Sequence, residues 1–145
     1  MGNINPEKIK ASDFYRGNDP FTENDTSTSW DGVIHCSTIP GYPDHRRLDK
    51  PIPCGDGLIM PGFVWNGASV GVMRYAGILS FPKWKHPIST CRHDLRCSLA
   101  KNRSQRKFAD QQFRRDVGIG GTKWEQIKGY LGVRIGALFG VGVNK

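Results

Sequence analysis

The sequence predicts an α+β fold with an irregular N-terminal arm, a small β-hairpin and a core of two or three helices. The first sixty residues hold few apolar side chains, whereas the second half carries them at helical spacing. The 18 Gly and 9 Pro favour loops and short elements. A chain of 145 residues suits one domain with a core. We therefore expect an irregular arm over residues 1–50 and a single helical domain with a hairpin over residues 51–145.

The arm is predicted from a succession of turn-forming segments, GNDP, ENDTSTS and PGYPDH. Such an arm is either disordered or wraps along a neighbouring protein. Over residues 51–72, the apolar pieces GLIM and GFVW flank Pro61-Gly62, which predicts the hairpin. The hairpin ends in a compact turn that includes Asn66 and Gly67.

Three helices are expected in the remainder of the chain. The first covers residues 88–100 with Ser89 or Thr90 as its N-cap, and the second covers residues 104–118. The third opens with the capping box Thr122-Lys123-Trp124-Glu125. Its apolar positions recur at helical spacing, and they are Trp124, Ile127, Leu131, Ile135 and Leu138. Its glycines, three or four residues apart, indicate either close packing against another helix or chain, or chance at a frayed end.

The net charge of +8 favours an anionic partner such as nucleic acid, lipid head groups or an acidic protein. Eight basic residues lie between Arg92 and Arg115, and they either line a phosphate-rich surface or form the solvated faces of two helices. No helix-turn-helix, finger or stacking motif is visible, so specific reading of a nucleic acid is not expected.

The N-terminal segment MGNINPEKIK is polar and lacks the apolar stretch of a secretory signal. The most apolar run, residues 131–143, contains Arg134 and is shorter than the ~20 residues that span a bilayer. We expect a soluble protein made in the cytoplasm, which could still be carried elsewhere in a particle. Without an export signal, the four cysteines are expected to be thiols.

The segment TCRHDLRC, residues 90–97, places His93 and Asp94 side by side on the first helix. On the second helix, Asp110 shares a face with Phe113 and Val117, so its carboxylate is expected to point into the core. A buried carboxylate needs a partner, and the short connection between the helices makes them antiparallel neighbours. His93 would then be an imidazole that Asp110 orients, with one nitrogen left to take a proton from water. The same pattern also fits a buried hydrogen bond that only ties two helices together.

The two helices resemble those of prokaryotic phospholipase A2 in the segments Cys91-Arg92-His93-Asp94 and ADQQFRRD, residues 109–116. The resemblance implies that His93 activates water, that Asp110 orients His93 and that Asp94 binds calcium. It also implies that a Gly-rich turn upstream supplies backbone oxygens to the ion, a place that Asn66 and Gly67 could fill.

A wider pattern is similar to a family of phage and prophage proteins catalogued as a domain of unknown function. It runs from GFVWNGAS, through the His-Asp pair and Arg106-x3-Asp110-x2-Phe113, to a glycine-rich C-terminal helix, over residues 58–140. Both families usually have Tyr at the position of Cys97, and the phage family often has Asp at the position of Asn66.

The sequence therefore favours a phage-encoded protein with a phospholipase A2-like His-Asp centre that hydrolyses an ester or acyl bond. It would act in a virion or in disruption of the host envelope, with calcium as its cofactor and an anionic lipid as its partner, and the first two helices would supply the basic surface. The alternative is a non-catalytic tail or head component of the virion that wraps neighbouring virion proteins with its N-terminal arm. The loss of the usual Tyr and Asp fits this alternative.

Overall fold

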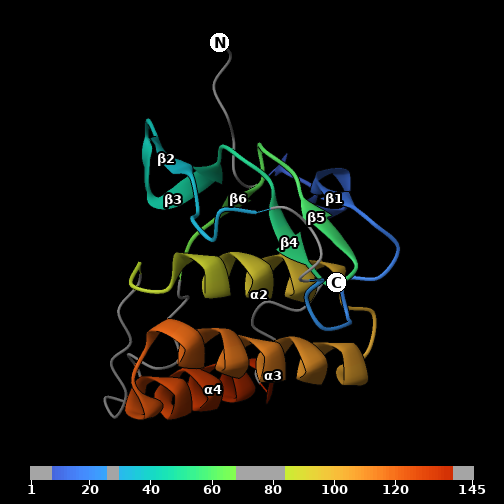
Figure 1. Cartoon of the computed structure of the whole chain (residues 1–145), viewed down its shortest axis with the longest axis vertical. Coiled ribbons are helices and arrows are strands. Elements are labelled where there is room, and N and C mark those ends of the chain that lie inside the picture. The colour runs from blue at the N-terminus through green and yellow to red at the C-terminus, as the bar shows by residue number, and fades with distance from the viewer. Residues whose placement is uncertain (1–7, 26–29, 68–83, 139–145) are drawn as a thin grey trace. The chain divides into compact units, whose positions relative to one another are not determined.

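The computed structural model describes residues 8–25, 30–67 and 84–138 (Figure 1). The chain divides into two compact units, Met1–Asn66 and Gly67–Lys145. In the described residues, the first unit holds the β-strands and the second holds the α-helices, so we call them the strand unit and the helical unit. The predicted α+β class is confirmed. The division between the units falls after Asn66, whereas the sequence placed a boundary after residue 50.

The described part of the strand unit contains two antiparallel sheets of three strands each. Their strand orders are β1-β5-β4 and β2-β3-β6. The elements are the 3₁₀ helix η2 (Ala11–Phe14) and the strands β1 (Tyr15–Arg16), β2 (Cys36–Ile39), β3 (Tyr42–Leu48), β4 (Ile52–Cys54), β5 (Gly57–Ile59) and β6 (Val64–Trp65).

Strands β2 and β3 lie within the range for which the sequence predicts an irregular arm. They pair with Ile39 opposite Tyr42, so Pro40 and Gly41 form the two-residue turn between them. Gly41 has a φ of 83°, and a Pro followed by a positive-φ Gly is the pattern of a type II turn. The segment PGYPDH, which indicated a loop, is therefore the turn of a hairpin and the start of its second strand.

The predicted pairing of GLIM with GFVW is wrong. Strand β5, from the first piece, pairs with β1 and β4, whereas β6, from the second piece, pairs with β3 in the other sheet. The hairpin that forms instead joins β4 to β5 through Gly55 and Asp56. Gly55 has a φ of 60°, a conformation that side chains with a Cβ rarely adopt, so it marks the turn.

The helical unit contains α2 (Pro87–Leu99), α3 (Arg103–Gly120) and α4 (Lys123–Leu138). The buried apolar side chains of α2 and α3 are Cys91, Leu95, Cys97, Ala109, Phe113 and Val117. None of the described helices combines the length and the apolar content needed to cross a membrane. All four cysteines are free thiols, as expected.

The helix ends agree only in part with the predicted caps. The predicted capping box is confirmed, because Glu125 N–H donates to Thr122 Oγ1 (3.1 Å) and Thr122 N–H donates to Glu125 Oε1 (3.0 Å). Helix α2, however, begins at Pro87, and neither Ser89 nor Thr90 is its N-cap. Proline is favoured in the first turn because its missing N–H would have no helical partner there.

The expected apolar stripe of α4 is partly exposed to solvent. Trp124 is 61% exposed and Leu131 is 46% exposed. The glycine contacts expected on the same helix involve residues 129, 132, 136 and 140, whose packing lies outside what the structure describes.

Candidate functional site

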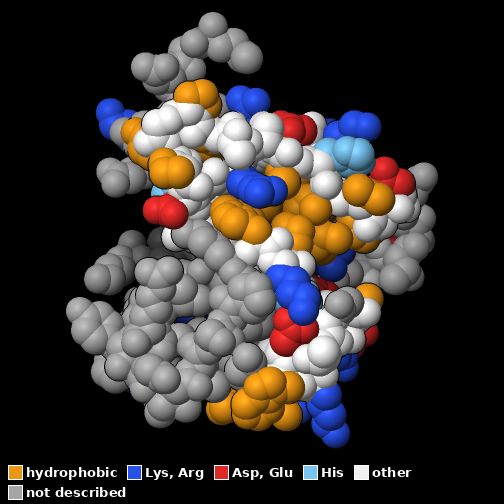
Figure 2. All heavy atoms as spheres, turned by 90° about the vertical axis from the view of Figure 1, so that its left-hand side faces the viewer, with side chains coloured by type: hydrophobic (Ala, Val, Ile, Leu, Met, Phe, Trp, Pro, Cys, Tyr) orange, Lys and Arg blue, Asp and Glu red, His pale blue; other side chains and the backbone are white. Residues whose placement is uncertain are grey.

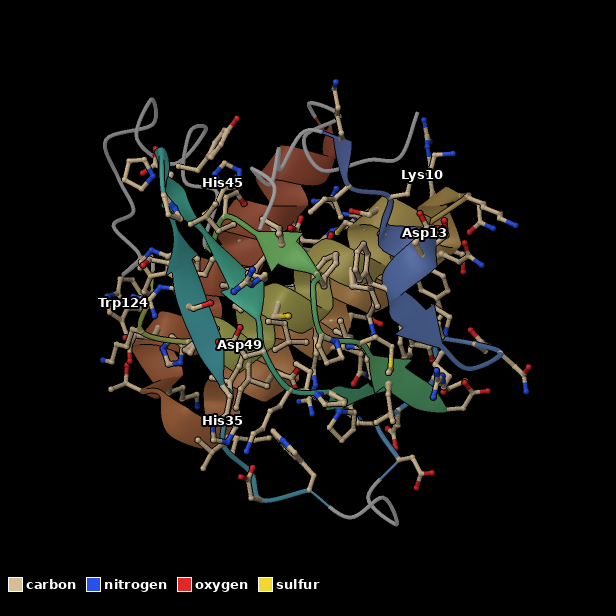
Figure 3. The ribbon with its side chains drawn as sticks, turned by 90° about the horizontal axis from the view of Figure 1, so that it is seen from above. Lys10, Asp13, His35, His45, Asp49 and Trp124 are labelled. Carbon is tan, nitrogen blue, oxygen red and sulfur yellow. The ribbon has the colours of Figure 1, made fainter. Side chains whose placement is uncertain are left out.

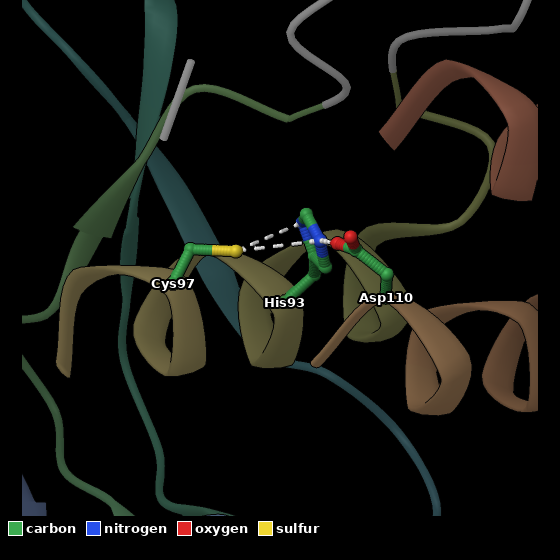
Figure 4. A group of neighbouring side chains, drawn as sticks. All are labelled: His93, Cys97 and Asp110. Carbon is green, nitrogen blue, oxygen red and sulfur yellow. Dashed lines mark hydrogen bonds and ion pairs between the residues drawn. The ribbon is translucent and has the colours of Figure 1, made fainter. Parts of the chain in front are cut away.

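The hydrogen bond predicted between His93 and Asp110 is present. His93 Nε2 on α2 lies 2.7 Å from Asp110 Oδ1 on α3 (Figure 4). The Asp110 side chain is fully buried, whereas His93 keeps 14% of its side chain exposed. The His93 ring also packs against Phe113, with 4.9 Å between the ring centroids. Because an ionised carboxylate only accepts hydrogen bonds, Nε2 carries a proton, and Nδ1 is the nitrogen that neutral His93 can use as a base.

Two arginines that the sequence analysis did not assign to the site also bind Asp110. Arg106 Nε donates to Oδ1 at 3.0 Å, and Arg134 Nη1 donates to Oδ2 at 2.7 Å. Arg106 also donates to the backbone oxygen of Val133 on α4 at 3.1 Å. One buried carboxylate thus receives hydrogen bonds from α2, α3 and α4. We call His93, Arg106, Asp110 and Arg134 the Asp110 cluster.

A signal for Arg106 was visible, because it stands four residues before Asp110 and so on the same helix face. Arg134 was visible only as a charge inside an apolar run. Nothing in the sequence connects it to a carboxylate 24 residues earlier.

Cys97 is the third neighbour of the His93 ring. Its Sγ lies 3.4 Å from His93 Nε2 and 3.8 Å from Nδ1, and the residue is buried. Burial by itself lowers the pKa of His93, but the electrostatic contact with Cys97 and the hydrogen bond to Asp110 outweigh it and raise the pKa to about 9. His93 is therefore an imidazolium at neutral pH.

His93, Cys97 and Asp110 offer ligand atoms within 4.8 Å of one another, so we tested them as a metal site. A ligating imidazole must first lose a proton, which the raised pKa of His93 opposes. Asp110 already carries two guanidinium groups, whose positive charge repels a cation. The donor set does not suit a metal ion.

Asp94 lies beside His93 on α2 and is half-buried. Burial raises its pKa to about 6, although the charge of His93 lowers it. Its side chain makes no ion pair with any residue that the structure describes. Arg92, two residues before Asp94 on the same helix, pairs with Asp116 on α3 at 3.3 Å.

The structure leaves the predicted role of Asn66 and Gly67 untested. Asn66 ends the strand unit and Gly67 begins the helical unit, and the following residues of the turn, 68 and 69, lie outside the described residues. Gly67 has a φ of 68°, which agrees with a tight turn at this point. A calcium site shared by this turn and Asp94 stays a prediction.

The basic surface is smaller than the sequence indicated. Arg92 and Arg96 on α2 are buried, as is Arg106 on α3. The Arg96 guanidinium packs over the Phe108 ring at 5.6 Å. The prediction that α2 contributes a basic surface is therefore wrong for Arg92 and Arg96, since both contact side chains of α3.

A pocket of about 300 Å³ also lies in the strand unit. It is lined by Trp30, Asp31, His35, Lys50, Pro51, Pro53 and Leu58. Figure 3 labels His35, whose Nε2 lies 3.1 Å from Asp31 Oδ2. The backbone N–H of Val33 and the imidazole of His35 lower the pKa of Asp31. The side chains of this pair are well exposed.

Comparison with protein-family models, with curated proteins and with solved structures finds no match to this chain. The resemblances drawn from its motifs therefore stay predictions, and the geometry of the helical unit carries the functional argument.

Proposed function

We propose that the helical unit is a hydrolase of ester or related acyl bonds, with His93 as the general base and Asp110 as the residue that orients it. The observation that carries this proposal is the 2.7 Å hydrogen bond between a fully buried carboxylate and a partly exposed imidazole. This bond fixes Nε2 as the protonated nitrogen and directs the basic lone pair to Nδ1. The resemblance to prokaryotic phospholipase A2 supports the same assignment.

The proposed reaction begins when neutral His93 takes a proton from a water molecule at Nδ1. The resulting hydroxide attacks the acyl carbon, and the leaving alkoxide receives the proton back from the imidazolium. Asp110 takes no part in the proton transfer and positions His93, while Arg106 and Arg134 donate hydrogen bonds to its carboxylate. The products are a carboxylic acid and an alcohol.

In this proposal Asp94, a half-buried carboxylate that has no ion pair among the described residues, is the side chain that would hold calcium. When bound, calcium would supply positive charge that stabilises the oxyanion of the reaction. Burial disfavours the charged form of Asp94, and a cation beside it would offset that cost.

The pH dependence of hydrolysis tests the proposal. Only neutral His93 can act as a base, and its pKa of about 9 leaves roughly one molecule in a hundred active at pH 7. We expect the rate of fatty-acid release from anionic vesicles, with calcium present, to rise about fiftyfold between pH 7 and pH 9. A rate that levels off near pH 6.5 would contradict this assignment of the base.

Cys97→Ser provides the control for the pH profile. Serine places a hydroxyl beside the ring in place of the thiol and removes the contribution of Cys97 to the raised pKa of His93, so this pKa should fall and the rate should level off at a lower pH. Since the folded-state pKa of His93 lies above its unfolded value of about 6.5, its charge stabilises the fold fully below that pH. This stabilisation is lost as the pH rises through about 9, so the melting temperature should fall over the range in which the rate rises.

Calcium binding gives an independent prediction at Asp94. Since only the folded chain assembles a site, millimolar calcium should raise the melting temperature by about 3 °C or more, and Asp94→Asn should remove the shift. Protonation of Asp94 should also remove it below about pH 6. Magnesium serves as the matched ion, because it demands a stricter octahedral geometry than calcium. An unchanged melting temperature in the parent protein would leave a calcium role without support.

A second candidate function is a non-catalytic component of a virion, in a tail or a head. The Asp110 cluster favours it, because a carboxylate bonded from three helices and a charged His93 form a structural ion network without any turnover. In this role the N-terminal residues would bind other virion proteins. Absence of hydrolysis at every pH would favour this function.

A further inference from the structure

Helix α3 presents a one-sided basic surface. Among the described residues of α3, the exposed positions recur three or four residues apart, as expected for one helix face. They include four cations, Arg103, Lys107, Arg114 and Arg115, and no carboxylate. We call these four residues the α3 basic face. The acidic residues of the same helix, Asp110 and Asp116, are buried and paired with other groups.

Exposed apolar side chains adjoin the C-terminal end of this face. Ile119, near the end of α3, is 85% exposed, and Trp124, in the first turn of α4, is 61% exposed. Lys123, which is also exposed, precedes Trp124. Figure 2 shows exposed hydrophobic side chains beside Lys or Arg side chains at its lower edge, and Figure 3 shows Trp124 at the outer edge of the ribbon.

The α3 basic face and α4 are joined by a direct contact. The Arg114 guanidinium lies over the ring of Tyr130, with 5.3 Å to its centroid. Leu131, the next residue of α4, is 46% exposed and stands two turns after Trp124 on the same helix face. On α3 itself Arg115 and Ile119 stand one turn apart, so a cation and an exposed aliphatic side chain are neighbours in this stretch of the α3–α4 pair.

We propose that this stretch docks the protein on the surface of an anionic phospholipid bilayer. The α3 basic face and Lys123 contact the lipid phosphates, while Ile119 and Trp124 enter the boundary between head groups and acyl chains. Each cation near an anionic membrane contributes about fivefold in affinity. Tryptophan suits this boundary because it has an apolar body and one polar N–H.

Charge complementarity alone would also fit a nucleic acid, but the apolar residues favour a lipid. An aliphatic side chain that is 85% exposed gains nothing from a phosphate backbone, whereas at a bilayer it becomes buried. The inference deepens the proposed function by naming the surface on which the substrate is presented, and it rests on that function only for the link to catalysis.

Vesicle flotation with the full-length chain tests the inference. The His93→Asn variant is used so that lipid is not consumed, and phosphatidylcholine vesicles are compared with vesicles containing phosphatidylglycerol. We expect at least tenfold tighter binding to the anionic vesicles. The double variant Lys107→Glu, Arg114→Glu should lose at least tenfold in affinity, whereas Lys8→Glu, Lys10→Glu, with the same change in net charge on exposed residues of the strand unit, should keep it.

The apolar contribution is tested with Ile119→Ser, Trp124→Ser. This variant should bind anionic vesicles at least tenfold more weakly and lose the part of binding that survives high salt, while its affinity for duplex DNA stays unchanged. Equal binding to DNA and vesicles, with no effect of these two substitutions, would overturn the lipid proposal in favour of a general polyanion surface. Because the positions are exposed, unchanged melting temperatures confirm that the variants fold.

The docking proposal and the hydrolase proposal can fail independently of each other. Hydrolysis of a dispersed short-chain ester needs His93 but no bilayer, so the surface variants should keep that activity. Vesicle binding without any hydrolysis would overturn the enzyme and leave the docking surface, and hydrolysis without vesicle binding would do the reverse.

Discussion

His93→Asn is expected to lower the rate of ester hydrolysis by about 10²- to 10⁴-fold, the usual contribution of a positioned general base. Asparagine can still donate a hydrogen bond to Asp110, so the connection between α2 and α3 is retained while the proton acceptor is lost. The comparison is best made near pH 9, where half of His93 is neutral in the parent protein. Fatty-acid release from anionic vesicles with calcium present is the measurement.

His45→Asn is the matched control for this substitution. His45 lies on β3 in the strand unit, and its ring contacts Tyr42 edge-on at 6.1 Å. The control should keep the parent rate. If His93→Asn kept the parent rate, His93 would have no part in the reaction. If neither the parent protein nor the variants hydrolysed the ester, the non-catalytic virion role would be favoured.

Asp110→Asn is expected to destabilise the helical unit by about 3–5 kcal/mol, the cost of removing one partner from a buried ion pair. The substitution leaves Arg106 without the charge that its Nε contacts at 3.0 Å, and the same holds for Arg134 at 2.7 Å. It also leaves the His93 imidazolium beside a neutral amide. Urea unfolding at pH 7, followed by circular dichroism, measures the change in the free energy of unfolding.

Asp94→Asn, measured without calcium, is the control for this loss of stability. It removes a carboxylate from the same site that has no ion pair among the described residues, so we expect a change below about 1 kcal/mol. A loss of similar size in both variants would show that general disturbance of the site, and not the Asp110 cluster, accounts for the effect.

The strand unit shows why sequence patterns located its strands poorly. Pro40 and Gly41 indicate a turn, but a type II turn inside a hairpin and a turn inside a loop use the same residues. Strand β3 contains Pro43 and Asp44, which disfavour a strand, and it forms because β2 and β6 pair with it on its two sides. The partner of β5 was equally undetermined, because strand pairing depends on contacts between residues distant in sequence.

Helical spacing by itself determined the main features of the candidate site. It placed Asp110 on the buried face of its helix with Phe113 and identified His93 as its partner, because a period of 3.6 residues and a three-residue connection restrict which side chains can meet. Local hydrogen bonding likewise determined the capping box at Thr122 and Glu125.

Only the tertiary structure decided the electrostatics of the site. Arg134 approaches from α4 and donates a hydrogen bond to Asp110, and the position of Cys97 one turn after His93 helps to hold the imidazole in its protonated form. The burial of Arg92 and Arg96, which limits the basic surface to α3, also follows from how the helices pack. Charge and pKa depend on distances and burial in three dimensions, and the order of residues in the chain leaves both undetermined.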